Sequence, residues 1–350
     1  MSRPHPSASA GPSLRRIAAA LGLAALILAG CAAPPPAPPA EDAPPPRETD
    51  ILASDREFAI VVVQRGETLA ALAQKYLGDP GKGWWIAEFN GIEQVQAGQE
   101  VVIPLRNRNV YGVYASGFQT IPILCYHRFG ANKSAMTVTQ PAFEQQMDYL
   151  AKNGYRVIPL AHLARFLDGK EPMPKKTVAI TIDDGYRATY QIAYPVLKKY
   201  NFPATVYLYT DFVGAGDALT WPQMEEMVRS GVIEIQPHSK THSNLTVKLA
   251  GESDARYVER MRKEVDVPIN VIKDRLAAST FSYAYPYGDV NDTIVDLLAR
   301  QNVQYGVTVT AGGNGFFSHK YMLRRTMIYG TEDLEQFKSK LATFARTAAR

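Results

Sequence analysis

The chain has 350 residues, 46% of them hydrophobic and 21% charged, and a formal net charge of +4. This length allows about two domains, and the composition is that of an ordinary globular protein. Three arginines and no acidic residues lie in the first 30 positions, so the rest of the chain carries a formal charge of +1. Such a small charge excludes a nucleic-acid partner held by clustered lysine and arginine.

The first thirty residues have the pattern of a secretion signal. Arg3, Arg15 and Arg16 precede an apolar run over residues 17–28, and Leu-Ala-Gly stands directly before Cys31. The apolar run is shorter than the roughly 20 residues that a membrane-spanning helix needs. Leu-Ala-Gly-Cys resembles the lipobox of bacterial lipoproteins, which implies removal of residues 1–30 and lipidation of Cys31. An ordinary signal peptide with a chance cysteine is the alternative.

Residues 31–57 form the predicted lipid anchor and linker. The stretch is rich in proline and alanine, a composition that cannot bury a core and predicts an extended spacer. We therefore expect a protein attached to a membrane through lipid. Ala32, rather than Asp, follows Cys31, and by analogy with lipoproteins this predicts the outer membrane, facing the periplasm, if the cell is Gram-negative.

Residues 58–105 are predicted to fold as a small β-α-α-β unit. Strand-like runs lie at both ends, and between them Leu69, Leu72, Ala73 and Tyr76 have the spacing of an amphipathic helix. Gly78 is placed to end that helix. A second short helix is expected to contain Trp84 and Trp85, with one ring in the core and the other partly exposed.

This unit resembles a LysM module. The matching pattern is G-E-T-L at 66–69, W-I at 85–86, Asn90, G-Q at 98–99 and I-P at 103–104. The resemblance implies binding of the N-acetylglucosamine of peptidoglycan or chitin in a groove between two loops. The residues implied to line that groove are Gly66, Glu67, Thr68, Asn90 and Ile92.

From residue 119 onward, strands and helices alternate to residue 350. Apolar, strand-like runs lie at 121–127, 155–160, 177–182, 203–209, 232–236, 280–285 and 305–310. Thr220 and Gln223 form a capping-box pattern that opens a helix at Trp221. The alternation predicts an α/β domain with a parallel sheet or barrel covered by helices. In such folds reactive groups gather past the C-terminal ends of strands.

Three of these predicted strands end in polar motifs. Asp183 and Asp184 follow the strand at 177–182, and His238 and His242 follow the strand at 232–236. Two adjacent carboxylates repel each other unless a nearby cation neutralises the repulsion. One carboxylate with two imidazoles leaves coordination positions open, which is typical of a catalytic metal site. The two histidines can share a face if the residues between them form a helical turn. Taken alone, the two aspartates could simply form a turn, and the two histidines could lie on a solvated helix face.

The three motifs resemble those of the polysaccharide deacetylases with a NodB-homology domain, carbohydrate esterase family four. T-I-D-D-G at 181–185 is similar to T-F-D-D-G, H-S-K-T-H at 238–242 fits H-[ST]-x-x-H, and A-Y-P-Y-G at 284–288 is similar to R-x-P-Y-G. The resemblance implies a distorted (β/α) barrel over 119–350 and a hydrolase that removes acetyl groups from N-acetylated sugar polymers with a divalent metal. Zn²⁺ is favoured, with Co²⁺ and Ni²⁺ as alternatives. The implied roles are Asp183 as general base, Asp184, His238 and His242 as metal ligands, and Tyr287, beside Pro286, as oxyanion donor through its N–H.

Two departures from the family pattern affect the prediction. Ala284 stands where an arginine normally orients the base, and Leu323-Arg324-Arg325 stands where the family has L-x-H with its general acid. These departures, the C-Y-H at 125–127 and the late arginine are similar to the branch that deacetylates poly-N-acetylglucosamine exopolysaccharide. His127 and His319 are candidates for the acid, and Cys125 is expected to be a buried thiol.

The leading hypothesis is therefore a lipid-anchored, metal-dependent N-deacetylase of a GlcNAc-containing exopolysaccharide. A peptidoglycan deacetylase and a catalytically inert glycan-binding anchor are the alternatives. The predicted partners are the N-acetylated polymer, peptidoglycan through the LysM module and a membrane through the lipid.

Overall fold

The computed structural model describes residues 51–106 and 109–346. The predicted signal peptide, the predicted lipidation site Cys31 and most of the linker lie outside the described residues. Within the two described ranges, no helix combines the length and the apolar character that crossing a membrane requires.

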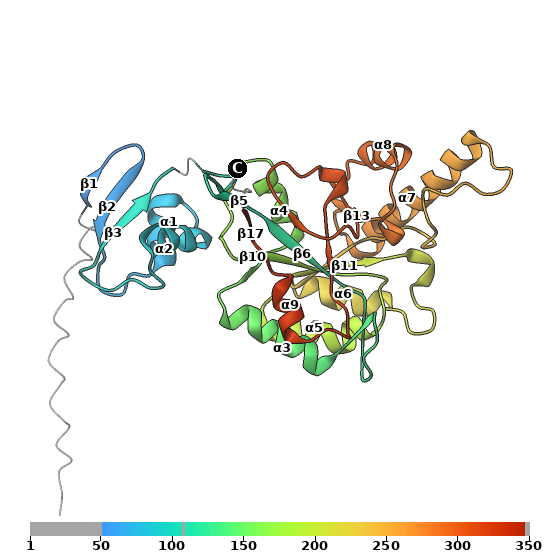
Figure 1. The fold of residues 1–350 in the computed structure, drawn as a ribbon, viewed down its shortest axis with the longest axis horizontal. Coiled ribbons are helices and arrows are strands. Elements are labelled where there is room, and N and C mark those ends of the chain that lie inside the picture. The colour runs from blue at the N-terminus through green and yellow to red at the C-terminus, as the bar shows by residue number, and fades with distance from the viewer. Residues whose placement is uncertain (1–50, 107–108, 347–350) are drawn as a thin grey trace, which may run out of the picture. The chain divides into compact units, whose positions relative to one another are not determined.

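The first module is a three-stranded antiparallel sheet with two helices. β1 (Ile51–Ser54), β2 (Phe58–Val62) and β3 (Glu100–Pro104) pair in that order. The connection from β2 to β3 runs through α1 (Leu69–Leu77), η1 (Pro80–Lys82) and α2 (Gly83–Asn90) (Figure 1). The predicted β-α-α-β order is confirmed, and β1 extends the sheet with residues that the sequence assigned to the linker.

The boundaries of α1 follow from local chemistry. The Thr68 hydroxyl accepts a hydrogen bond from the N–H of Ala71, and Gly78 adopts a left-handed φ of 71° as it ends the helix. Leu72 and Ala73 are buried in the module core. Trp84 and Trp85 are both half-buried, so the expectation that one of them is core was wrong. Ile86, the next residue, is fully buried and packs there instead.

The main domain is built on parallel strands. β6 (Ile121–Tyr126), β10 (Thr177–Ile182), β11 (Ala204–Leu208) and β12 (Ile233–Pro237) lie in the order β12-β11-β10-β6, and β16 (Thr326–Met327) pairs with β6 on the edge away from β10. β13 (Ser282–Ala284) and β14 (Tyr305–Val307) form a separate parallel pair. The shorter strands are β4 (Val113–Tyr114), β5 (Gly117–Gln119), β7 (Arg128–Gly130), β8 (Thr137–Thr139), β9 (Arg156–Val157), β15 (Gly313–Asn314) and β17 (Phe344–Arg346).

Helices cover the strands on two sides. In Figure 1, α3 (Gln140–Lys152), α5 (Tyr194–Tyr200), α6 (Trp221–Arg229) and α9 (Leu334–Ser339) lie on one side of the central strands, and α4 (Leu160–Leu167), α7 (Asp254–Leu276) and α8 (Asp292–Arg300) lie on the other. The predicted capping box at Thr220 and Gln223 is present at the start of α6. Single helical turns are η2 (Thr189–Ala193), η3 (Thr210–Phe212), η4 (Pro286–Gly288) and η5 (Lys320–Met322).

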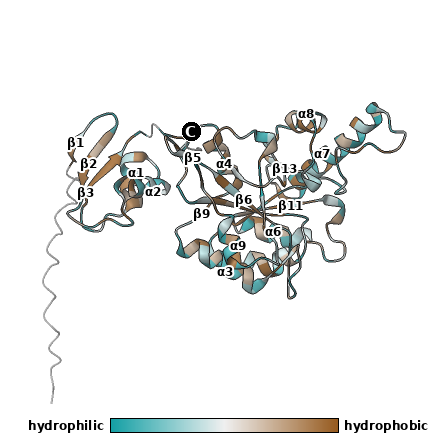
Figure 2. Cartoon of the chain, viewed as in Figure 1, coloured by the Kyte–Doolittle hydropathy of each residue, from teal (hydrophilic) through white to brown (hydrophobic). Residues whose placement is uncertain are grey.

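Neighbouring residues on the central strands belong to different cores. Ile180 packs in a core that includes residues of α3, α5 and α6, whereas Ala179 and Tyr207 pack in a second core with Ala284 of β13. β6 and β10 are buried along their whole length, as expected of parallel strands covered on both faces. Figure 2 shows hydrophobic residues along β6 and a mixture of hydrophobic and hydrophilic residues on the surrounding helices.

The α/β class is confirmed, and the strand arrangement is compatible with the predicted distorted barrel. The Tyr207 hydroxyl donates to Ser282 Oγ at 3.0 Å, joining β11 to β13 across the interior. An isolated bridge between Val307 and Leu323 joins β14 to the segment before β16. In the part of the chain that the structure describes, however, no backbone ladder joins β12 to β13, so the sheet is not one closed cylinder.

Candidate active site

Polar side chains gather in a cavity of about 390 Å³ just past the carboxyl ends of four parallel strands. His127 follows β6, Asp183 and Asp184 follow β10, His238 follows β12, and Tyr287 lies in η4 after β13. The remaining lining residues are His242, Met136, Tyr285, Val309, Met327 and Tyr329. The structure thus brings all three sequence motifs to one place.

Asp184, His238 and His242 could together hold a metal ion. Nε2 of His242 lies 3.3 Å from Asp184 Oδ1, and Nε2 of His238 lies 3.7 Å from the same oxygen. The ligand atoms all lie within 4.8 Å of one another. Asp184 Oδ1 is buried and accepts no hydrogen bond from any described residue. A buried carboxylate oxygen without a donor, facing two imidazole nitrogens, fits a divalent cation.

The ring of His238 is oriented for ligation. Its Nδ1 lies 2.8 Å from the carbonyl oxygen of Ala284, and because a carbonyl only accepts, Nδ1 must carry the proton. Nε2 therefore presents a lone pair toward Asp184. Burial lowers the pKa of His238 more than the nearby carboxylates raise it. The neutral, metal-binding form of the ring is the one that this environment favours.

The segment from His238 to His242 does not form the helical turn that the sequence analysis named as one way to bring the two histidines together. Ser239 and His242 adopt left-handed backbone conformations, with φ of 76° and 62°. The N–H of His242 donates to Ser239 Oγ at 2.8 Å. Two left-handed residues fold the segment back on itself, so the histidines share one side without a helix.

Glu264 of α7 holds this turn, and the sequence analysis did not identify it. Its carboxylate accepts hydrogen bonds from the N–H groups of Lys240 and Thr241, at 3.0 and 2.9 Å, and from the Thr241 hydroxyl at 2.8 Å. The side chain is only 5% exposed. The available signal was an acidic residue within the apolar face of a helix, between Met261 and Val265, which are both buried.

Left-handed conformations recur in the other two motifs. Among the described residues, seven non-glycine positions have positive φ, and Asp184, Ser239, His242 and Tyr287 are four of them. Such conformations cost of the order of 1 kcal/mol each and cluster at functional sites. The ring of Tyr287 is 60% exposed and lies 5.0 Å from the ring of His242, while Pro286 before it is buried.

Arg325 holds the carboxylate of Asp183 through two hydrogen bonds. Nη1 and Nη2 of the guanidinium donate to Oδ1 and Oδ2 of Asp183 at 2.6 and 2.7 Å, and Nε donates to the carbonyl of Thr308 at 2.8 Å. Arg325 is 0% exposed and Asp183 is 1% exposed. Burial raises the pKa of Asp183, but the charge of Arg325 and its hydrogen bonds outweigh this, so the pKa lies well below its usual range. Asp183 is therefore a fixed carboxylate at neutral pH.

Comparison with known proteins assigns this site to a family. The polysaccharide deacetylase model matches residues 170–306, and the LysM domain model matches residues 61–104. YxkH of Bacillus subtilis, whose name places it among polysaccharide deacetylases, is 30% identical over 208 residues, which are 59% of this chain and 71% of YxkH. The chain belongs to the polysaccharide deacetylase family. It is a polysaccharide N-deacetylase that also carries a LysM domain.

Named relatives and solved structures agree with this assignment. The poly-β-1,6-N-acetyl-D-glucosamine N-deacetylase of Escherichia coli K12 is 25% identical over 248 residues, 61% of this chain and 37% of that enzyme. The enzyme of the same name from Staphylococcus aureus MRSA252 is 27% identical over 201 residues, 55% of this chain and 68% of that enzyme. The Streptococcus pyogenes deacetylase PplD has a TM-score of 0.56 at 29% identity, covering 64% of this chain and 98% of PplD. IcaB of Ammonifex degensii has a TM-score of 0.57 at 26% identity, covering 64% and 96%.

An arginine from another part of the chain, Arg325, takes the place of the arginine that is missing from the deacetylase motif. Ala284 is buried and has no group to hold Asp183, but Arg325 supplies a guanidinium from the segment that leads into β16. This is possible because β10 and β16 flank the same strand, β6. The sequence signal was an arginine directly before an apolar strand, in the position where the family has L-x-H.

Of the two candidate acids in the deacetylase, only His127 faces Asp183. Nε2 of His127 lies 4.0 Å from Asp183 Oδ2. His319 lines a different cavity, and its Nδ1 accepts from the N–H of Tyr321 at the start of η5. Cys125 is buried, as expected, and its Sγ lies 3.7 Å from Asp183 Oδ2. Burial raises the pKa of Cys125 well above its usual range, so this group remains a thiol.

The candidate glycan contacts of the LysM domain make local bonds. The Asn90 amide donates to the carbonyls of Ile86 and Val102 and accepts from the N–H of Val102, at 2.7–2.9 Å. Glu67 accepts from the N–H of Gln64, and Thr68 caps α1. Gly66 has a left-handed φ of 87°, and Ile92 packs against the module core. These side chains shape the two loops, and both N–H groups of the Asn90 amide are used in doing so.

Proposed function

We propose that this polysaccharide deacetylase is a divalent-metal-dependent enzyme that removes N-acetyl groups from a GlcNAc-containing exopolysaccharide. The observation that carries the proposal is the meeting of Asp184, His238 and His242 around one buried carboxylate oxygen, next to Asp183. The Escherichia coli and Staphylococcus aureus relatives are named for poly-β-1,6-N-acetyl-D-glucosamine, and this supports the choice of polymer.

Asp184, His238 and His242 would hold the cation. A set of two histidines and one carboxylate suits Zn²⁺, and Co²⁺ and Ni²⁺ are compatible with it. When bound, the cation would lower the pKa of a water molecule and polarise the acetyl carbonyl.

Different residues of the chain would then accept and donate the protons of the reaction. Asp183 accepts a proton from the water that attacks the acetyl carbonyl, and the Arg325 fork leaves a lone pair on each carboxylate oxygen for this purpose. The N–H of Tyr287 donates to the oxyanion as charge develops. His127 gives a proton to the sugar nitrogen as the C–N bond breaks. The products are acetate and a free amine on the polymer.

We also propose that the enzyme works outside the cytoplasm. Residues 1–30 would be removed and Cys31 lipidated, so that the deacetylase is attached to the outer membrane, facing the periplasm, in a Gram-negative cell. The LysM domain would then bind peptidoglycan. Replacing Cys31 with serine tests the anchor: the variant should leave the membrane fraction for the soluble periplasmic fraction, and unchanged membrane attachment would contradict lipidation.

Metal removal tests the reaction. The protein is treated with a chelator, Zn²⁺ or Co²⁺ is restored, and acetate released from poly-β-1,6-GlcNAc oligomers is measured. We expect activity to disappear and return with the metal, and Asp183→Asn to stay inactive throughout. A wild-type protein no more active than Asp183→Asn would favour the inert glycan-binding anchor. Acetate release at the same rate with and without the chelator would refute metal dependence.

Peptidoglycan is the second candidate substrate, and the LysM match at residues 61–104 favours it. The full chain and a form lacking residues 58–105 are compared on poly-β-1,6-GlcNAc and on peptidoglycan. If peptidoglycan is the substrate, loss of the module should reduce activity on peptidoglycan alone. Equal activity of both forms on exopolysaccharide, with neither active on peptidoglycan, supports the first candidate.

A further inference from the structure

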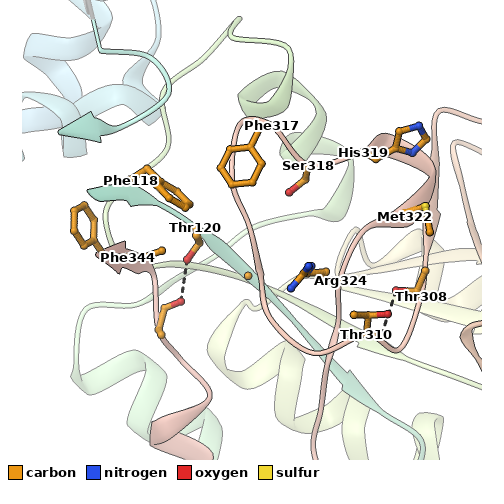
Figure 3. A pocket seen from close by; sticks show the side chains of 13 residues that line it. Phe118, Thr120, Thr308, Thr310, Phe317, Ser318, His319, Met322, Arg324 and Phe344 are labelled. Carbon is orange, nitrogen blue, oxygen red and sulfur yellow. Dashed lines mark hydrogen bonds between the residues drawn. The ribbon is translucent and has the colours of Figure 1, made fainter. Parts of the chain in front are cut away.

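A second cavity, of about 750 Å³, lies in the deacetylase domain and has no described lining residue in common with the catalytic cavity. Its walls come from β5, β17, η5 and the segment 308–318. Figure 3 shows Phe118, Phe317 and Phe344 on one side of Arg324, with Met322 and His319 on the other. We call this cavity the rear cleft.

One wall of the rear cleft is aromatic and open to solvent. Phe317 is 63% exposed and Phe344 is 39% exposed. Phe118 and Phe317 meet edge to face, with ring centroids 5.0 Å apart. The face of an aromatic ring carries partial negative charge and attracts the C–H groups on the flat side of a sugar ring. Exposed rings gathered in a cavity mark a binding surface rather than a core.

Arg324 gives the rear cleft a positive charge with unused donors. Arg324 and His319 are the ionisable groups of the lining, and no described carboxylate lines the cleft or forms an ion pair with Arg324. The guanidinium makes one hydrogen bond, a long one of 3.5 Å to the carbonyl of Ala311, although it has five N–H groups. A negatively charged ligand would complete these bonds.

The backbone around Arg324 is rigidly held. Asn314 is fully buried, its Oδ1 accepts from the N–H of Arg324 and its Nδ2 donates to the Arg324 carbonyl, both at 2.9 Å. Gly312 has φ of +133°, and a Cβ there would lie 3.2 Å from Arg324 Cδ, so glycine leaves room for the arginine side chain. A site that is formed before its ligand arrives loses less entropy on binding.

We propose that the rear cleft binds an anionic saccharide. Sugar rings stack on Phe317 and its neighbours, and a carboxylate or phosphate group on the sugar pairs with Arg324 through two parallel hydrogen bonds. A neutral oligosaccharide has no anionic group to pair with Arg324. An acidic peptide has no sugar ring to stack on the phenylalanine rings. The proposal is independent of the exopolysaccharide reaction, because binding at the rear cleft needs no acetate release.

The test is calorimetric titration of the full chain with four probes: an oligogalacturonate, glucosamine 6-phosphate, a neutral chito-oligosaccharide of the same length as the oligogalacturonate, and a polyglutamate peptide. We expect Arg324→Gln and Phe317→Ala each to weaken oligogalacturonate binding by at least 10-fold. Arg324→Lys should weaken oligogalacturonate binding less, because lysine keeps the positive charge and loses only the pair of parallel hydrogen bonds. Arg300→Gln, an exposed arginine at the end of α8, is the matched control and should change nothing.

The outcomes separate the possible ligands. Binding of glucosamine 6-phosphate that depends on Arg324 would support the proposal with phosphate as the anionic group. Equal oligogalacturonate affinity in wild type and Arg324→Gln would overturn it. Binding of the neutral oligosaccharide or of polyglutamate that depends on Arg324 and is as tight as that of oligogalacturonate would also overturn it. Circular dichroism of each variant shows whether the fold is retained.

Discussion

Arg325 and Asp183 form a buried ion pair whose two members need each other. A buried charge without a partner is strongly unfavourable, and both side chains are almost fully inaccessible. Burial lowers the pKa of Arg325, but the charge of Asp183 outweighs this and raises it. The pair therefore stays ionised, and the fork fixes both oxygens of the carboxylate that faces the cavity. Positioning of the proposed base and stability of the domain depend on the same two hydrogen bonds.

Replacing Arg325 with methionine should therefore damage both properties. Asp183 would remain buried without its partner, and we expect a loss of about 3–5 kcal/mol in the free energy of unfolding. Activity should fall roughly 100-fold, because the carboxylate would no longer be held in place. Urea denaturation and initial rates of acetate release measure the two effects.

The matched control is Arg300→Met on the exposed end of α8, which should stay within about 0.5 kcal/mol of wild type. The double variant Arg325→Met/Asp183→Asn should be more stable than Arg325→Met alone, since it leaves no buried charge unpaired. If the single and double variants unfold at the same urea concentration, the pair does not act as described.

At the scale of elements, α7 holds the turn that carries the two proposed histidine ligands. Glu264 accepts three hydrogen bonds from Lys240 and Thr241, and its own carbonyl accepts from the Tyr283 hydroxyl at 3.1 Å. One residue of α7 thus joins the turn after β12 to the strand β13. The two left-handed residues of the turn persist because these bonds hold them.

Glu264→Gln should weaken metal binding while keeping the fold. The amide group has one acceptor oxygen in place of two, so a donor of the turn would lose its partner. Groups behind metal ligands usually contribute 10–100-fold in affinity, and we expect a Zn²⁺ affinity lower by that factor in competition with a chromophoric chelator. Glu259→Gln on the exposed side of the same helix is the control. Equal zinc affinity in Glu264→Gln and wild type would contradict the supporting role.

A second contact ties the loop before α7 to that helix and makes its stability depend on pH. Arg260 donates to both oxygens of Glu252, at 2.8 and 2.7 Å, and the N–H of Leu249 donates to Glu252 as well. The hydrogen bonds from Arg260, more than any other contact, lower the pKa of Glu252 from 4.5 to about 2. A carboxyl group with a lower pKa in the folded state stabilises the fold above its unfolded pKa.

Glu252→Gln should consequently be less stable than wild type at neutral pH, by an amount that is constant down to about pH 5. The difference should shrink as the pH falls from 4.5 towards 2, because wild-type Glu252 then becomes protonated too. Urea denaturation of the metal-free proteins across this range measures it. A difference that persists unchanged at pH 3 would show that the Glu252 charge is not responsible.

At the scale of the whole molecule, strand order brings distant residues into one site. Asp184 follows β10, while His238 and His242 follow β12, two strands away in the sheet. A cation bound by all three would therefore link separate parts of the deacetylase domain in the folded state only. All three proposed ligands belong to this domain, and none belongs to the LysM domain.

Metal should accordingly stabilise the deacetylase domain and leave the LysM domain unchanged. At a free Zn²⁺ concentration of about 100 times the dissociation constant, the free energy of unfolding should rise by about 2.7 kcal/mol. Differential scanning calorimetry with Zn²⁺ and with a chelator measures the shift. His242→Ala should lose most of it, and an equal shift in that variant would place the metal elsewhere.

The sequence by itself determined the α/β class, the main strands, the helix caps and the residues of the three motifs. These features depend on short-range patterns: β-branched runs for β6 and β10, a capping box at Thr220, and polar groups where strands end. The choice between His127 and His319, the replacement of the missing arginine by Arg325, and the support from Glu264 came only from the tertiary structure. Each is a contact between residues far apart in the chain, and strand order and helix packing, which spacing along the chain does not encode, decide which of them meet.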